Sequence, residues 1–142
     1  MTNLIKIIAV GRIKEKYIQD AISEYEKRIK PLSKFNIVEI KDEGIIKESD
    51  KIGVYLQDKN TYLLDPAGKQ FTSEDFSDFI KKSDCEITFI VGGFDGVSED
   101  VKNGAQMISL SKMTFTHEMA RLFLVEQIYR AFMIINNRKY HK

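Results

Sequence analysis

Residues 117–142 constrain the fold of this chain most, because residues 119–135 form a nearly unbroken apolar stretch. Four polar residues interrupt that stretch: Arg121, Glu126, Gln127 and Arg130. At about 100° per residue along a helix, Glu126 and Arg130 share one face while Arg121 points the opposite way. Such a helix has no ordinary solvent face, so we expect it to be enclosed by its own domain or packed against a second chain. Its few charged groups must then find partners where they are buried.

The charge balance gives no overall sign of a polyanionic partner. The 142 residues include 22 Lys and Arg against 21 Asp and Glu, a net charge of +1, and 43% hydrophobic residues are enough to close one core. The C-terminal segment from residue 117 is locally basic, with five cations against two acidic residues. This excess would suit RNA phosphates, although a solvated tail is the commoner meaning of such a run.

Cysteine usage predicts that the protein works in a reducing compartment, and hydropathy predicts that it does not cross a membrane. Cys85 is the only cysteine, which excludes an intramolecular disulfide and a cysteine-based zinc site, and we expect it to be a buried structural thiol. Residues 1–10 are short and strand-like with Lys6 inside the apolar run, unlike a signal peptide. Residues 119–135 fall short of the roughly 20 residues that span a bilayer. We therefore predict a cytoplasmic protein.

Apolar periodicity predicts strands that alternate with helices. The third strand should break at Pro66-Ala-Gly68, whose turn chemistry is strong, and Thr72-Ser-Glu-Asp75 resembles a capping box. This alternation predicts an α/β fold with a mostly parallel sheet and helices on both faces. The predicted strands are 4–10, 35–40, 61–65, 86–91 and 107–110, and the predicted helices are 14–30, 46–58, one capped at Thr72, 98–106 and the apolar C-terminal helix.

A ligand site in such a sheet lies at the carboxyl ends of the strands, near a switch point. Three strand ends stand out there: Leu64-Asp65, Gly92-Gly93 and residues 110–116. Glycines 92, 93 and 96 would let a ligand approach the main chain, but a tight strand-to-helix turn explains them about as well. They match neither the dinucleotide fingerprint nor a P-loop.

Residues 109–118 have an unusual composition for a strand-to-helix connection. The segment carries four hydroxyl side chains together with apolar Met113 and Phe115. This mixture suits an ordered loop folded around a ligand. Alternatively, Thr116 simply caps the last helix, and the two interpretations are compatible.

Together these motifs closely resemble the ribosomal RNA large subunit methyltransferase H family of the SPOUT superfamily. The resemblance covers the whole chain and is carried by Leu64-Asp65 with Gly68-Lys69, by residues 91–96 and 110–117, by residues 126–131, and by the terminal Tyr140-His141. It implies one domain over residues 1–142, a C-terminal trefoil knot and a homodimer. The implied reaction is methyl transfer from S-adenosylmethionine to ring nitrogen N3 of a pseudouridine in 23S ribosomal RNA, without a metal or a membrane.

The resemblance also implies which residues bind and react. Position alone would suggest disorder for Tyr140 and His141, yet the family places its terminal Tyr-His pair at the active site, with His141 as proton acceptor or base-positioning group. Arg130, held in direction by Glu126, completes the catalytic candidates, although an exposed pair at this spacing is an ordinary helix-stabilising contact. Cofactor contacts, mostly from the main chain, are expected at Leu64, Gly92, Ser111, Lys112, Met113, Thr114, Phe115 and Thr116.

Two residues depart from the family pattern, and other functions stay open. The family usually has proline before the histidine and glutamine or proline after it, where this chain has Thr116 and Glu118. The low net charge suggests that the substrate is the assembled ribosome rather than naked RNA. The alternatives are a methyltransferase of another RNA such as tRNA, and a non-catalytic module that binds S-adenosylmethionine or RNA.

Overall fold

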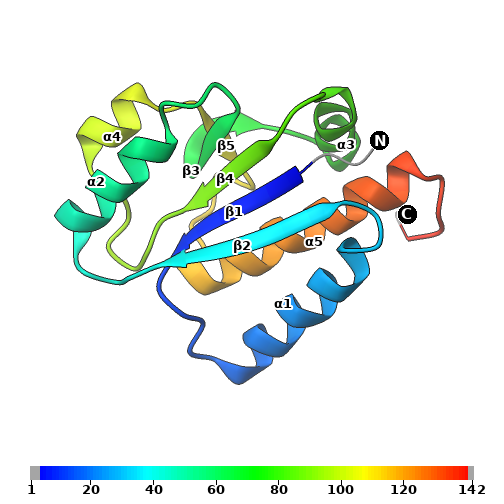
Figure 1. Cartoon of the computed structure of the whole chain (residues 1–142), viewed down its shortest axis with the longest axis horizontal. Helices are drawn as coiled ribbons and strands as arrows, with labels where there is room; N and C mark the ends of the chain where they lie inside the picture. The colour runs from blue at the N-terminus through cyan, green and yellow to red at the C-terminus, as the bar shows by residue number, and fades with distance from the viewer. Residues whose placement is uncertain (1–3, 141–142) are drawn as a thin grey trace.

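Five strands form one parallel sheet in the order β2-β1-β4-β3-β5 (Figure 1). The computed structural model describes residues 4–140. The strands are β1 (Leu4–Val10), β2 (Lys34–Ile40), β3 (Thr61–Gln70), β4 (Ile87–Val91) and β5 (Met107–Ser109). The chain leaves β1 toward β2 and leaves β4 toward β5, in opposite directions, although β1 and β4 are neighbours. Their carboxyl ends therefore form a switch point, where parallel sheets bind ligands.

Helices cover both faces of the sheet, as the sequence predicted. α1 (Lys16–Ile29), α3 (Ser73–Lys82) and α5 (His117–Ile135) pack on one face, and α2 (Ile45–Tyr55) and α4 (Glu99–Gly104) pack on the other (Figure 1). β1 shows why both faces are apolar: Ile5 and Ile7 join the core under α1, α3 and α5, while Ile8 and Val10 join the smaller core under α2 and α4. Buried on both sides, the strand reads as a continuous apolar run.

The third strand does not stop at Pro66-Ala-Gly68, contrary to the prediction. Leu64 and Lys69 both pair with Ile108 of β5, so the residues between them bulge out of the ladder and the strand continues to Gln70. Gly68 permits this, because a Cβ there would lie only 2.6 Å from the main-chain nitrogen of Ile108. The turn residues thus form a bulge that a tertiary partner, β5, holds in place.

Two smaller expectations also need correction. Cys85 is exposed instead of buried, and its Sγ accepts a hydrogen bond from Asn60 Nδ2 at 2.7 Å. It lies just before β4 begins, at the amino end of the strand, where the sheet does not enclose it. α2 ends at Tyr55, short of the predicted residue 58.

Three helices begin with the side-chain caps expected of their sequences. Thr72, Ser98 and Thr116 each accept the main-chain N–H of the third following residue, at 3.0, 3.4 and 3.2 Å. Each cap satisfies a donor that the first helical turn leaves free. The caps predicted at Thr72 and Thr116 are both confirmed, and at Thr72 the bond shown is the one from the Asp75 N–H to the threonine hydroxyl.

α5 has no exposed residue along its length, which agrees with the unusual pattern of its sequence. Arg121 is 3% exposed and points into the domain, where its Nη1 lies 2.7 Å from Glu39 Oε2 of β2. Its Nη2 donates to the carbonyl of Gly11 at 2.9 Å. The guanidinium therefore joins the last helix to the carboxyl ends of β1 and β2.

Glu118 lies one turn before Arg121 on α5 and binds the loop between β1 and α1 at the end next to α1. Its carboxylate is 7% exposed and accepts the main-chain N–H groups of Lys14 at 2.9 Å and Glu15 at 3.3 Å. These groups stand just before α1, where a helix leaves its first N–H groups unpaired. Arg121 and Glu118 together fix the loop between β1 and α1.

None of the helices within residues 4–140 combines the length and the hydropathy needed to span a bilayer. The C-terminal trefoil knot implied by the family resemblance stays a prediction.

Replacing Arg121 should destabilise the fold. Arg121→Met keeps most of the apolar volume but removes the donors to Glu39 and Gly11, so we expect the free energy of unfolding to fall by about 2 kcal/mol. The control is Lys16→Met, which breaks an exposed ion pair with Asp20 and should change little. Urea denaturation of both variants measures the difference, and equal effects would contradict the assigned role of Arg121.

Candidate active site

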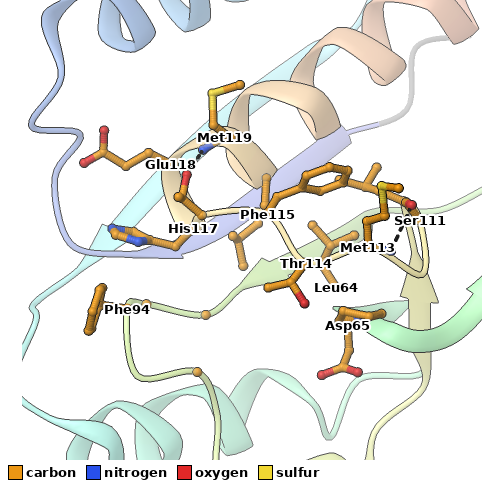
Figure 2. Close-up of a pocket in the computed structure, with 18 of the residues that line it drawn as sticks. Leu64, Asp65, Phe94, Ser111, Met113, Thr114, Phe115, His117, Glu118 and Met119 are labelled. Carbon is orange, nitrogen blue, oxygen red and sulfur yellow. Dashed lines mark hydrogen bonds between the residues drawn. The ribbon is translucent and has the colours of Figure 1, made fainter.

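A cavity of about 660 Å³ opens at the carboxyl ends of the strands, at the predicted edge of the sheet (Figure 2). Its walls come from Leu64 and Asp65 of β3, the glycine loop after β4 (residues 92–96), the loop after β5 (residues 110–116), the first turn of α5 and the start of α1. The volume suits a small-molecule site. Leu64, Val91, Leu110 and Phe115 make part of the wall apolar.

The loop after β5 is ordered by its own hydroxyl groups. Ser109 Oγ donates to the carbonyl of Ser111 at 2.8 Å, and Ser111 Oγ accepts the N–H of Met113 at 3.0 Å (Figure 2). Thr116 ends the loop as the cap of α5. Phe115 packs against Phe123 of α5, with ring centroids 5.1 Å apart. The polar and apolar residues of the segment thus have separate tasks, and together they hold one wall of the cavity.

The glycine loop needs glycine for packing as well as for turning. A Cβ on Gly93 would lie 2.7 Å from Val10 Cγ1, so the loop lies directly against the end of β1. Gly96 has a φ of +75°, and its N–H donates to the carbonyl of Gly93 at 3.0 Å. Packing against Val10 therefore accounts for Gly93, and the tight turn accounts for Gly96. The turn leaves Gly92 and Gly93 lining the cavity.

Two buried side chains of α2 support the glycine loop from behind. Glu48 is 2% exposed and accepts the N–H groups of Glu43 and Gly44, both at 2.8 Å. Burial raises the pKa of the Glu48 carboxyl, and the neighbouring Asp42 carboxyl raises it further. The next residue, Ser49, accepts the N–H of Ser98 at 3.1 Å. Sequence reasoning missed both residues, because nothing distinguishes Glu48 from the exposed acidic residues around it.

Seven of the eight residues predicted to contact the cofactor line this one cavity. They are Leu64, Gly92, Ser111, Met113, Thr114, Phe115 and Thr116. Lys112 is exposed and does not contribute to the wall. His117 also lines the cavity, at the start of α5 as expected. The structure thus brings three distant segments together, and their contacts with a cofactor stay a prediction.

The predicted catalytic residues gather elsewhere, near the other end of α5. The Glu126 carboxylate binds Arg130 Nη2 at 2.8 Å and accepts the hydroxyl of Tyr140 at 2.7 Å. The Arg130 guanidinium lies 4.9 Å from the centre of the Tyr140 ring, and the Tyr140 hydroxyl is 3.2 Å from that of Tyr25. Burial, followed by these two hydrogen-bonding partners, raises the pKa of Tyr140 far above its ordinary value. His141 lies outside the described residues.

The cluster of Glu126, Arg130 and Tyr140 does not border the large cavity. Arg130 follows His117 by 13 positions along one helix, a separation of about 20 Å at 1.5 Å per residue. Glu126 instead lines a second cavity of about 390 Å³ beside α3, which shares Leu110 and Phe115 with the large cavity. A single chain therefore keeps the predicted cofactor residues apart from the predicted catalytic residues.

The described residues contain no group of three or more metal-ligating side chains. Asp65 instead has a structural role. Its carboxylate accepts the N–H of Ala67 at 2.9 Å and pairs with Lys102 at 3.5 Å.

Comparison with known proteins shows the family of this chain. The family model described as predicted SPOUT methyltransferase matches residues 4–141. The chain is 42% identical to the ribosomal RNA large subunit methyltransferase H of Fusobacterium nucleatum, over 97% of this chain and 99% of that one. It is 43% identical to the protein of the same name from Coprothermobacter proteolyticus, with the same coverage.

A solved structure supports the fold alone. The tRNA (m1G37) methyltransferase from Aquifex aeolicus superposes with a TM-score of 0.54 at 17% identity, over 90% of this chain and 70% of that one. The family follows from the sequence matches, which run along nearly the full length of the chain. The chain belongs to the ribosomal RNA large subunit methyltransferase H family of the SPOUT methyltransferases.

Proposed function

We propose that this protein uses S-adenosylmethionine to methylate N3 of a pseudouridine in 23S ribosomal RNA on the assembled ribosome. The observation that carries the proposal is the large cavity at the switch point, because seven residues expected from the family to contact the cofactor line it. The relatives' names support ribosomal RNA as the substrate class.

The residues of the cavity fit the cofactor by their chemistry. Apolar side chains such as Leu64 and Phe115 can enclose an adenine ring, while main-chain groups of the loop after β5 can read its edge. Gly92 and Gly93 add main-chain groups to the same wall. S-adenosylmethionine, when bound, supplies an activated methyl group. The protein's task is then to align the target nitrogen and accept its proton.

A second copy of the chain would bring the predicted catalytic residues close to the predicted cofactor residues. Met119, Leu122, Phe123, Glu126 and Arg130 follow one another at helical spacing, and each is partly exposed, so α5 presents a mixed stripe along its surface. If two copies pack through this stripe with antiparallel helices, the partner's Arg130 and the partner's Tyr140 come to lie near the cavity of the first copy. We propose a homodimer of this geometry.

Within the proposed dimer the terminal residues have different tasks. The raised pKa of Tyr140 keeps its phenol protonated, so its hydroxyl is a hydrogen-bond donor and not a base. Arg130 is held in direction by Glu126 and suits a phosphate or a base edge. His141 can accept a proton near neutral pH, and we assign it the N3 proton of the pseudouridine.

Methyl transfer is the direct test of this function. Ribosomes isolated from cells that lack the protein should accept labelled methyl from S-adenosylmethionine, and nucleoside analysis of the 23S RNA should give N3-methylpseudouridine. Free 23S RNA is the matched substrate and should react poorly. Labelling of tRNA instead would contradict the substrate, and cofactor binding without transfer to any cellular RNA would indicate a non-catalytic module.

Gly93→Ala should weaken cofactor binding. The added Cβ would push the glycine loop away from Val10, and we expect the dissociation constant of S-adenosylmethionine to rise about tenfold, or about 1.4 kcal/mol. Gly53→Ala is the control, since that glycine lies inside α2 with open space around it and alanine favours helix. Calorimetric titration compares them. Unchanged affinity in Gly93→Ala would remove the glycine loop from the cofactor site.

Mixed dimers test whether the active site combines two copies. Arg130→Met and Gly93→Ala should each be nearly inactive at low S-adenosylmethionine concentration. A refolded equal mixture should recover roughly one quarter of wild-type activity, because half of the random dimers carry one intact composite site. No recovery, in a mixture shown to exchange subunits, would place all functional residues in one chain.

A further inference from the structure

The mouth of the large cavity is lined by exposed apolar side chains. Among the described residues, five large hydrophobic side chains are exposed, and three of them line this cavity. These three, the cavity rim, are Tyr17 at 68%, Phe94 at 84% and Met113 at 74% exposure. The other two, Ile46 and Val54, lie on α2. Exposed apolar groups gathered around one opening mark a binding surface more often than scattered ones do.

The glycine loop that carries Phe94 packs against β1 and α2. It follows Gly93, which packs on Val10, and Glu48 and Ser49 buttress the loop from behind. The Phe94 ring meets the imidazole of His117 edge to face, with centroids 6.3 Å apart and planes at 89° (Figure 2). An aromatic ring that stands open to solvent at the mouth of a cavity is suited to receive another flat ring.

Charge near the rim favours a nucleotide. Arg12, Lys14 and Lys16 are exposed in the connection that leads into α1, next to Tyr17. Exposed Glu15 and Asp95 are the acidic groups of the same segments, and Lys16 pairs with Asp20 at 2.6 Å, so Arg12 and Lys14 are the cations of this connection that can bind phosphates. Aromatic faces beside cations are the pattern by which proteins hold unstacked bases of single-stranded RNA.

A second copy of this chain fits the rim less well. The partly exposed stripe of α5 already offers a continuous helical surface for self-association, and neither Tyr17 nor Phe94 belongs to it. The rim side chains come from three separate segments around an opening, which suits one inserted group better than a packed helix.

We propose that Tyr17 and Phe94 form a stacking site for an unstacked base of the RNA substrate, at the entrance to the cavity. This inference rests on the proposed function and specifies how the same site takes its substrate. Tyr17 and Phe94 hold the base by its faces, and Arg12 and Lys14 bind the adjoining phosphates.

Kinetics with ribosomes test the stacking site. Phe94→Ala should raise the KM for ribosomes about tenfold, while Phe94→Trp, which keeps an aromatic face, should stay close to wild type. Tyr17→Ala should act in the same direction. The matched control is Ile46→Ala, which removes a similarly exposed apolar side chain that does not line the cavity.

Two further measurements separate this inference from its rivals. Calorimetry should give an unchanged dissociation constant for S-adenosylmethionine in Phe94→Ala, and sedimentation should give an unchanged dimer. A loss of cofactor affinity in Phe94→Ala would place Phe94 in the cofactor-binding site. Dissociation of the variant into monomers would place the cavity rim in the dimer interface. If the wild-type protein is active and both alanine variants keep its KM for ribosomes, the stacking site alone is overturned. If the wild-type protein is inactive on ribosomes, the proposed function is overturned.

Discussion

The fold depends on two buried charges of α5 that bind the first loop of the chain. Arg121 reaches Glu39 and the carbonyl of Gly11, and Glu118 takes the N–H groups before α1. Each buried charge thereby gains hydrogen-bond partners, which is the condition under which the burial of a charge is tolerated. Because Glu118 also lines the cavity, the contacts that close the fold also shape the site. The fold and the proposed activity therefore share one set of interactions.

Local patterns were enough to predict most elements, because strand and helix periods are written in neighbouring residues. Apolar runs gave the parallel strands, and Thr72 and Thr116 marked helix starts correctly. The continuation of β3 past Pro66 was missed, because it depends on pairing with β5, which is distant in the sequence. The burial of Glu48 was missed because its carboxylate lies beside Gly93, which is distant in the sequence.

The site was predictable to the extent that its residues follow strand ends. Parallel strands bring their carboxyl ends to one edge, so the sequence alone could place residues 64, 92 and 111–116 together. The separation of Arg130 from residues 111–116 follows from its position along the helix that starts after them. The position of Tyr140 was not predictable, because a helix pattern does not say where the chain runs after the helix ends. Glu126 shows the difference: its spacing to Arg130 was clear, but its hydrogen bond to Tyr140 requires the chain to turn back after α5.

The exposed thiol has a practical consequence. Cys85 is the only cysteine, and it lies at the amino end of β4, while the cavity lies at the carboxyl end. Five strand residues at about 3.3 Å each put roughly 16 Å between the two. A maleimide dye attached there would label every molecule once, without mutagenesis and away from the cavity. Energy transfer between differently labelled copies could then follow subunit exchange, and fluorescence anisotropy could follow docking on ribosomes.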